Sequence, residues 1–348
     1  MGDAQSHSDP AMTTTQPRTF SGIQPSGSLH LGNYLGAIRN WVDAQDKFDN
    51  FFCVVDQHAI TVPYDPQQLA EMSRQVFALY LACGLKEEHC TLFIQSHVPA
   101  HTELAWLLTT LTPMNWCERM IQYKEKKEKV GEEASVGLFS YPILQAADIL
   151  LYQPQFVPVG EDQRQHIELC RDIARRFNDR FGHVFTVPQA QIRAEGARIM
   201  SLTDGTRKMS KSDPSDYSRI ELLDSPEDIQ RKIQKCKTDP IRGLAFGDPN
   251  RPEADNLLTL YHLLSGKSKE SVAQECADMG WGQFKPLLTE VVVTALAPIR
   301  QRYQELIGDP GFLNHLLHKN AQKARAVAEE TLQHCRQAMG FLPLPSLL

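Results

Sequence analysis

A glycine-rich stretch near the N-terminus, GSLHLGNYLG at residues 27–36, has residue types that suit phosphate binding. Glycine has no side chain to hold a nucleotide away from the backbone, so Gly32 and Gly36 would let a base or phosphate approach the first turn of a helix. His30 and Asn33 could donate hydrogen bonds to phosphate oxygens as negative charge grows on them. Taken alone, however, the stretch is more typical of a glycine-rich turn in a tightly packed α/β domain.

A second motif, KMSKS at residues 208–212, is far more specific. It places Lys208 and Lys211 in a loop flanked by Ser and Asp, without the apolar periodicity of a helix or strand. Ordinary residue frequencies give this five-letter word by chance in roughly one in several thousand chains of this size. Mobile lysines suit a leaving group with several negative charges, such as pyrophosphate, and Ser210 and Ser212 would add donors. The alternative is a solvated lysine loop.

The elements that would position these motifs alternate between strand and helix. Short apolar segments at 18–23, 51–55, 91–95 and 156–160 predict strands. Between the second and third, Asp65 and Pro66 predict a helix start and Gly84 its end. This pattern predicts an α/β fold in which a parallel sheet carries helices on both faces and binds ligands at the carboxyl ends of its strands.

Two further regions are helical in pattern. Residues 101–140 are highly charged and look like an insertion between the halves of the sheet. Residues 225–340 are almost entirely helical in pattern, beginning with a capping box from Ser225 to Asp228, and predict a C-terminal all-α domain.

Composition narrows the function class. The chain has 348 residues, 42% of them hydrophobic, and a net charge of −6, which argues against indiscriminate nucleic-acid binding. Its longest apolar runs are about half of what a membrane crossing needs, and residues 1–17 lack the pattern of a secretory signal. The eight cysteines are scattered without metal-ligand spacing. We therefore expect a cytoplasmic protein with no metal site of its own.

Together the two motifs resemble the paired signatures of class I aminoacyl-tRNA synthetases, since PSGSLHLGN (25–33) is similar to the HIGH motif and KMSKS is the second motif unaltered. The resemblance is narrower still, to tryptophanyl-tRNA synthetases of the bacterial type, and it extends from about Arg18 to Gly340. It rests on FSGIQPSG (20–27), VVDQHAITV (54–62), CTLFIQSHVPAH (90–101), AADILLY (146–152) and VPVGEDQRQHIEL (157–169).

The resemblance implies a domain plan. It predicts a flexible extension at 1–17 and a Rossmann-type catalytic domain at 18–216 that contains the KMSKS loop at 205–215. A helical tRNA-binding domain would follow at 217–310, and a C-terminal helix at 311–340 would pack back on the catalytic domain.

The implied reaction is activation of tryptophan by ATP, with Mg²⁺ as counter-ion, followed by transfer to tRNA(Trp). The residues with catalytic roles are His30, Asn33, Lys126, Lys208 and Lys211. Those implied to bind ATP are Gln24, Ser26, His30, Gly32, Asn33, Gly36, Gly160, Asp162, Ile199, Lys208, Met209, Ser210 and Lys211. Without the resemblance, the run around Lys126 predicts only a solvated helical face.

Tryptophan would be bound by Phe20, Gly22, Val55, His58, Tyr141, Gln145, Asp148, Val159 and Gln163. Asp148 lies in an apolar run where a carboxylate needs a partner, and the indole N–H is a single donor that would suit it. A substrate without that donor would leave the acid unpaired; a helix cap or a backbone bond is the alternative. Phe20, Val55, Val159 and Ile199 would form the apolar wall around the indole.

Two positions depart from the family pattern. Gln145 stands where some bacterial relatives have Met, and His30 where some have Thr. The way in which residue 145 would contact tryptophan therefore stays open. The imidazole of His30 should still donate to phosphate.

The resemblance also implies a homodimer, with apolar surface in residues 93–116, and local basic patches for tRNA. The candidate patches are Arg171, Arg175 and Arg176, then Arg231, Lys232 and Lys235, and KNAQKAR at 319–325. Each is more typical of a solvated helix face. A tyrosyl-tRNA synthetase and a tryptophan-sensing paralogue that charges no tRNA are the alternative functions.

Overall fold

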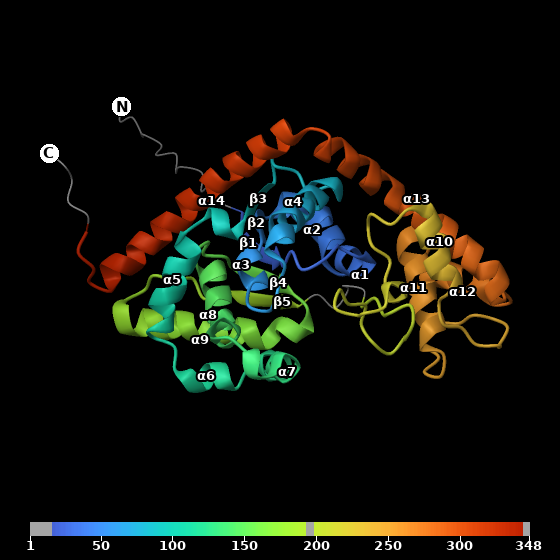
Figure 1. Cartoon of the computed structure of the whole chain (residues 1–348), viewed down its shortest axis with the longest axis horizontal. Helices are drawn as coiled ribbons and strands as arrows, with labels where there is room; N and C mark the ends of the chain where they lie inside the picture. Colours follow the sequence, from blue (N-terminus) through green and yellow to red (C-terminus); the bar gives the residue numbers. More distant parts are fainter. Residues whose placement is uncertain (1–15, 193–197, 344–348) are drawn as a thin grey trace, which may run out of the picture.

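The computed structural model describes residues 16–192 and 198–343. At its centre is a five-stranded sheet of order β3-β2-β1-β4-β5, in which every pairing is parallel (Figure 1). The strands are β1 (Arg18–Ile23), β2 (Asp49–Val54), β3 (Cys90–Ile94), β4 (Phe156–Val159) and β5 (Gln189–Ile192). The predicted α/β fold is confirmed. Strand β5 was not predicted, because it is short and carries two glutamines, which give no apolar pattern.

The helices that connect and flank the strands follow the expected alternation. Before β4 they are α1 (Leu31–Asn33), α2 (Arg39–Ala44), α3 (Asp56–Ala59), α4 (Pro66–Ala82), α5 (Ala100–Thr109), α6 (Met114–Glu118), α7 (Ile121–Val130) and α8 (Val136–Leu150). After β4 they are α9 (Arg164–Phe181), α10 (Pro226–Gln234), α11 (Pro252–Ser265), α12 (Lys269–Cys276), α13 (Trp281–Ile307) and α14 (Pro310–Ala338). The two predicted helix starts are confirmed, since the side chains of Asp65 and Ser225 accept from the backbone N–H groups of Gln67 and Asp228.

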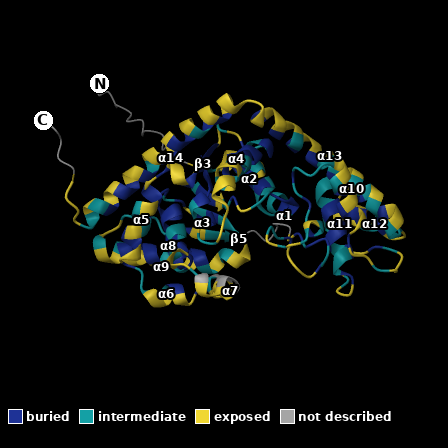
Figure 2. Ribbon diagram, viewed as in Figure 1, coloured by how far each residue is buried: buried dark blue, intermediate teal, exposed yellow. Residues whose placement is uncertain are grey.

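Two hydrophobic clusters cover the two faces of the sheet. In β2, Phe52 and Val54 belong to the first core cluster, whereas Phe51 and Cys53 belong to the second, as strand alternation requires. The first core cluster includes side chains of α4, α11 and α13, and the second includes side chains of α5, α8, α9 and the later part of α14. In the ribbon of Figure 2, buried residues (dark blue) are concentrated in the interior of the molecule, and exposed residues (yellow) lie along the outer side of the C-terminal helices.

The C-terminal helices extend along the sheet domain and do not stand apart from it. Helix α13 contacts α4, and α14 contacts β3 and α5, so that α13 and α14 form an arch over the molecule (Figure 1). The first core cluster runs from Leu31 at the glycine-rich stretch to Leu257, Phe284 and Leu296 in the helical part. The predicted boundary at residues 216 and 217 therefore crosses a shared core, and the domain plan stays a prediction.

Three further points concern the N-terminal extension, the possibility of a membrane helix and the helix after the glycine-rich stretch. Nearly all of the predicted extension at 1–17 lies outside the described residues. Within the described ranges, no helix is long and apolar enough to cross a membrane. The helix expected after the glycine-rich stretch is interrupted by a π-helical segment, Tyr34–Ile38, which contains Gly36. Such π-bulges occur frequently at functional sites.

Candidate active site

The candidate site lies at the carboxyl edge of the sheet. Gln24 follows β1, His58 follows β2, Gln95 follows β3 and Gly160 follows β4. Because β1 lies between β2 and β4, this edge is the topological switch point of the sheet. These four residues, which come from segments far apart in the chain, therefore follow strands that end at the same edge.

The glycine-rich loop is joined to the segment that follows KMSKS. The N–H of Leu31 donates to the carbonyl of Ile220 at 2.9 Å, and the N–H of Leu222 donates to the carbonyl of Leu29 at 2.8 Å. Gly27 has a φ of +103°, a conformation that L side chains rarely adopt. This turn directs the chain into the start of α1.

The KMSKS loop contacts the same turn. Lys211 Nζ donates to the carbonyl oxygens of Gln24 at 3.3 Å and Gly27 at 3.4 Å. Met209 is 2% exposed, and its N–H donates to the carbonyl of Ile199 at 3.0 Å. The two motifs, distant in sequence, therefore lie against each other.

His30 is a neutral imidazole in a cationic environment. Its burial, and then the nearby Lys211, Arg219 and Lys208, lower the pKa of His30 to about 3. Its Nδ1 atom is buried and has no hydrogen-bond partner among the described residues. A buried polar atom without a partner indicates a missing ligand or water.

Asn33 and Gly32 support the His30 segment. The amide oxygen of Asn33 accepts from the backbone N–H of His30 at 3.1 Å, so the NH₂ group of Asn33 can donate elsewhere. A Cβ on Gly32 would lie 2.9 Å from His30 Cε1 and 3.5 Å from Met209 Cβ. Gly32 was expected to make room for a nucleotide; what it makes room for in the structure is the imidazole of His30.

A chain of polar contacts runs from the KMSKS loop to residue 145. Lys208 Nζ lies 3.8 Å from Asp162 Oδ1, and Gln163 donates to Asp162 Oδ2 at 3.3 Å. Gln145 donates in turn to the amide oxygen of Gln163 at 3.3 Å. The two serines of the loop, Ser210 and Ser212, bond each other at 3.0 Å. The position that departs from the family pattern thus contacts another predicted tryptophan-binding residue.

Asp148 lies on α8 and is 1% exposed. Its carboxylate accepts from His58 Nε2 at 2.6 Å, from Gln95 Nε2 at 2.7 Å and from His101 Nδ1 at 2.6 Å. Burial raises the pKa of Asp148, but His58 and His101 outweigh it and lower the pKa to about 2. The expectation that the acid stays unpaired without a substrate donor is therefore wrong, because three protein donors bond it and leave acceptor capacity only on Oδ2.

Sequence reasoning missed Gln95, His101 and Tyr152 as parts of this site. His101 is fully buried, and its Nε2 lies 2.8 Å from the hydroxyl of Tyr152. The available signal was a His in the segment after β3, in a stretch otherwise rich in apolar residues.

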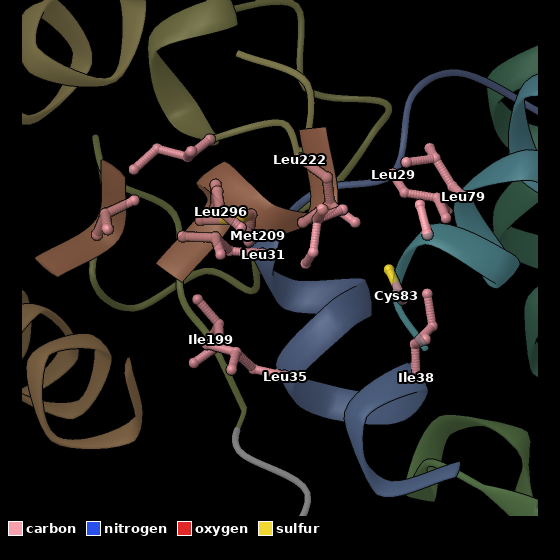
Figure 3. Packing of buried hydrophobic residues seen from close by; sticks show 14 of the residues in the cluster. Leu29, Leu31, Leu35, Ile38, Leu79, Cys83, Ile199, Met209, Leu222 and Leu296 are labelled. Atoms are coloured by element: carbon pink, nitrogen blue, oxygen red, sulfur yellow. The ribbon is translucent and has the colours of Figure 1, made fainter. Parts of the chain in front are cut away.

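Most of the predicted apolar wall lies near Asp148. Phe20 stacks on Tyr152 with ring centroids 5.4 Å apart, and a Cβ on Gly22 would lie 3.0 Å from Val55 Cγ1. Phe20 and Val55 belong to the second core cluster, and Val159 packs against it. Ile199 does not share this cluster: it lies in the first core cluster with Met209 (Figure 3). Ile199 therefore lies apart from the other residues of the predicted wall, and its assignment to ATP stays a prediction.

Tyr141 completes the polar side of this region. Its ring is edge-on to His58, with centroids 6.2 Å apart, and its hydroxyl lies 2.9 Å from His166 Nε2. Burial, with a smaller contribution from Glu125, raises the pKa of Tyr141 to about 12, so the hydroxyl keeps its proton.

Three further predicted ATP-site or catalytic residues, Ser26, Gly160 and Lys126, have few described contacts. Ser26 and Gly160 are exposed, and a Cβ on Gly160 would lie 2.8 Å from Asp162 Oδ1. Lys126 lies in α7, and its side chain is outside the part of the chain that the structure describes.

The predicted basic patches are mostly paired within the chain. Lys232 is 1% exposed and bonds Asp224 at 2.7 Å, so its assignment to an RNA surface is wrong. Arg231 pairs with Asp228 at 2.6 Å, and Lys319 pairs with Glu87 at 3.0 Å.

Arginines 175, 176 and 180 line a hollow of about 600 Å³ with Trp116, Asp172 and Asp179. Lys235 is exposed and lies 4.4 Å from the ring centre of Tyr217.

Comparison with known proteins agrees with this geometry. The family model for class I tRNA synthetases (W and Y) matches residues 12–297. The tryptophan–tRNA ligase of Thermosynechococcus vestitus is 62% identical over 326 residues, which are 92% of this chain and 99% of that protein.

Two solved structures are also similar. Tryptophanyl-tRNA synthetase from Campylobacter jejuni, complexed with ADP and tryptophan, has a TM-score of 0.82 and 36% identity, covering 93% of this chain and 100% of that one. Tryptophanyl-tRNA synthetase from Mycoplasma pneumoniae has a TM-score of 0.84 and 32% identity, covering 94% of this chain and 99% of that one. The chain therefore belongs to the class I tRNA synthetases, in the family of the tryptophan and tyrosine enzymes.

Proposed function

We propose that this protein is a tryptophan–tRNA ligase, which activates L-tryptophan with ATP and transfers it to the 3′ end of tRNA(Trp). The observation that carries the proposal is the contact of the KMSKS loop with the glycine-rich turn, at the same sheet edge as Asp148. The relative from Thermosynechococcus vestitus, named for tryptophan and similar over nearly the whole chain, supports the choice of amino acid.

In the first step a carboxylate oxygen of tryptophan attacks the α-phosphorus of ATP. The bond from that phosphorus to the bridging oxygen breaks, which gives tryptophanyl-adenylate and pyrophosphate. The carboxylate is already ionised, so no general base is needed; the enzyme aligns the reactants and stabilises the charge.

The nucleotide side of the cleft supplies that stabilisation. His30 and Asn33 donate to phosphate oxygens, and Lys208 and Lys211 neutralise the departing pyrophosphate, with Lys126 as a further cation. The buried Nδ1 of His30, which has no partner among the described residues, supports its role toward a ligand.

Mg²⁺ enters this scheme with ATP. No cluster of three His, Cys, Asp or Glu side chains in the described ranges could hold a metal ion. Mg²⁺ usually keeps several waters and binds through substrate phosphates. The triphosphate would carry the ion, and the two KMSKS lysines would share the neutralisation of its charge.

The amino-acid side selects tryptophan through Asp148. The carboxylate oxygen Oδ2 has one protein donor, His58, and retains capacity for the indole N–H. Phe20, Val55 and Val159 form the apolar wall, and Tyr141 and Gln163 bind the amino and carboxylate groups of the substrate.

In the second step a ribose hydroxyl of the tRNA 3′ end attacks the carbonyl carbon of the adenylate, and AMP leaves. The arginine-lined hollow on α9 is a candidate for tRNA, because phosphate contacts dominate such affinity. A homodimer is also proposed: Trp106 on α5 is 67% exposed and Met114 on α6 is 69% exposed, which leaves apolar surface for a second copy.

ATP–pyrophosphate exchange with each of the twenty amino acids, followed by tRNA charging, tests the proposal. We expect exchange with tryptophan alone and charging of tRNA(Trp). Equal exchange with tyrosine would overturn the amino-acid assignment, and exchange without charging would indicate a sensor.

A further inference from the structure

Asp148 is one end of a buried chain of hydrogen bonds that the proposed reaction does not use directly. His101 Nδ1 lies 2.6 Å from Asp148 Oδ1, and His101 Nε2 lies 2.8 Å from the hydroxyl of Tyr152. His101 and Tyr152 are both fully buried, and Asp148 is 1% exposed. Such a network is strong only if each proton is correctly placed.

With a neutral imidazole at His101, the protons of this chain have one consistent arrangement. Burial raises the pKa of Tyr152 well above its ordinary value, so the phenol keeps its proton and donates to His101 Nε2. An imidazole that accepts at Nε2 carries its proton at Nδ1 and donates it to the carboxylate. The opposite tautomer would place a nitrogen lone pair against the carboxylate. The carboxylate therefore selects the Nδ1–H tautomer of His101, and the bond from Tyr152 to Nε2 holds the ring in that state.

The two carboxylate oxygens of Asp148 are consequently unequal. Oδ1 accepts from His101 and from Gln95 at 2.7 Å, whereas Oδ2 accepts from His58 at 2.6 Å. Since a carboxylate oxygen has about two acceptor positions, Oδ2 is the oxygen with capacity left. The two bonds to Oδ1 also fix the rotation of the carboxylate group.

Tyr152 supports the apolar wall as well as the acid. Its ring stacks on Phe20 with centroids 5.4 Å apart and on Phe51 with centroids 4.8 Å apart. A substitution that removes the Tyr152 ring would therefore disturb both the apolar wall at Phe20 and, through His101, the position of Asp148.

We propose that His101, locked by Tyr152, is a positioning residue for tryptophan selection, which holds Asp148 so that Oδ2 accepts from the indole N–H. This inference rests on the proposed function, in which Asp148 recognises that N–H. His101 acts only through Asp148 and does not touch the substrate.

The test compares tryptophan with 3-(benzothiophen-3-yl)alanine, in which sulfur replaces the indole N–H. The ratio of kcat/KM for the two substrates in pyrophosphate exchange measures the recognition of that group. Three variants separate the two hydrogen bonds of His101. His101→Leu removes both bonds, and Tyr152→Phe removes only the hydroxyl that bonds Nε2. His101→Asn retains an N–H close to the position of Nδ1. Thermal unfolding and the KM for ATP serve as controls for damage to the fold.

We expect the parent to prefer tryptophan by about 100-fold or more, since a site built to accept an N–H rejects the analogue without it. His101→Leu should lower that ratio about tenfold or more, Tyr152→Phe by less, and His101→Asn by no more than about threefold. The KM for ATP should stay within about twofold throughout.

A folded His101→Leu variant with the parent's ratio would overturn the inference, as would equal losses for both amino acids and ATP. If His101→Leu does not fold, the other two variants test the inference. An unchanged ratio in Tyr152→Phe would then show that the bond from Tyr152 does not hold His101 in place for selection. A parent that does not activate tryptophan would contradict the proposed function itself. A parent that does not distinguish the two substrates would remove the role of Asp148 and this inference with it.

Discussion

The two sides of the cleft are built in opposite ways. On the amino-acid side, Asp148 is held by three donors at 2.6 to 2.7 Å. On the nucleotide side, the Lys208 side chain is 58% exposed and lies 3.8 Å from its acidic partner, and Lys211 makes two long bonds at 3.3 and 3.4 Å. The first side is held in place by the protein before a ligand binds, with one acceptor position of Asp148 Oδ2 left for it, whereas the second offers cations and donors to an anion.

This difference has a physical reason. Selection between similar amino acids needs groups held in fixed positions before binding. A triphosphate that must bind, react and leave as pyrophosphate is better served by side chains that can move with it. Changes on the two sides should therefore affect different ligands and by different amounts.

The largest effect is expected from Asp148→Asn. The amide keeps the size of the carboxylate but loses its charge, and its NH₂ group faces at least one of three donors, which leaves a buried group unsatisfied. We expect kcat/KM for tryptophan to fall about 1,000-fold, with KM for ATP changed by less than about threefold. Pyrophosphate exchange measures both, and the exposed Asp179→Asn is the matched control. An equal loss for ATP would show that Asp148 supports the fold and not the selection.

A smaller effect is expected at Lys211. Removing the cation in Lys211→Ala should lower kcat/KM for ATP about 100-fold, whereas Lys211→Arg retains the charge and should lose about tenfold or less. Exchange rates at varied ATP, with tryptophan saturating, measure these losses. An Ala variant as active as the Arg variant would contradict a role for the charge.

The pH dependence at Lys211 sharpens this point. Burial lowers the pKa of Lys211 to about 8, so the free enzyme carries the charge below that pH and loses it above. The kcat/KM for ATP should fall as the pH rises from 7 to 9 in the parent but not in Lys211→Arg, because arginine stays charged. The same fall in both proteins would assign the titration to another group.

A still smaller effect is expected from Gly32→Ala. The added Cβ would lie 2.9 Å from His30 Cε1, so the imidazole must shift from the phosphate side of the cleft. We expect kcat/KM for ATP to fall about tenfold, with kcat/KM for tryptophan nearly unchanged. Gly282→Ala, where the added Cβ meets nothing within 4 Å, is the control. A loss of the same size in both variants would point to the helices and not to His30.

Much of the fold was predictable because local and long-range signals agreed. Helix α4 has its N-cap Asp65, its first-turn Pro66 and the following Gly84 in sequence, and the structure confirms them. Strands β2 and β3 are almost entirely buried and mostly apolar, whereas β5 lies at the sheet edge with Gln189 and Gln191 and has no such signal.

The site was predictable only for residues that lie within one short sequence motif. The motifs showed which residues meet, but the partners of Asp148 come from segments after two other strands, and no spacing encodes that convergence. Lys232 was misread because its sequence neighbours are charged, while Asp224 and Asp216, which bond it, lie outside its helix. The place of Ile199 could not be predicted, because an apolar residue gives no sign of which of the two core clusters it joins.

The most direct test of the division between the two sides is equilibrium binding measured separately for each ligand. Calorimetric titrations of tryptophan alone, and of ATP with Mg²⁺ alone, would be made with the parent, Asp148→Asn and Lys211→Ala. The account predicts that Asp148→Asn loses affinity for tryptophan and retains it for ATP, and that Lys211→Ala does the reverse. Two variants that weaken both ligands equally would contradict it.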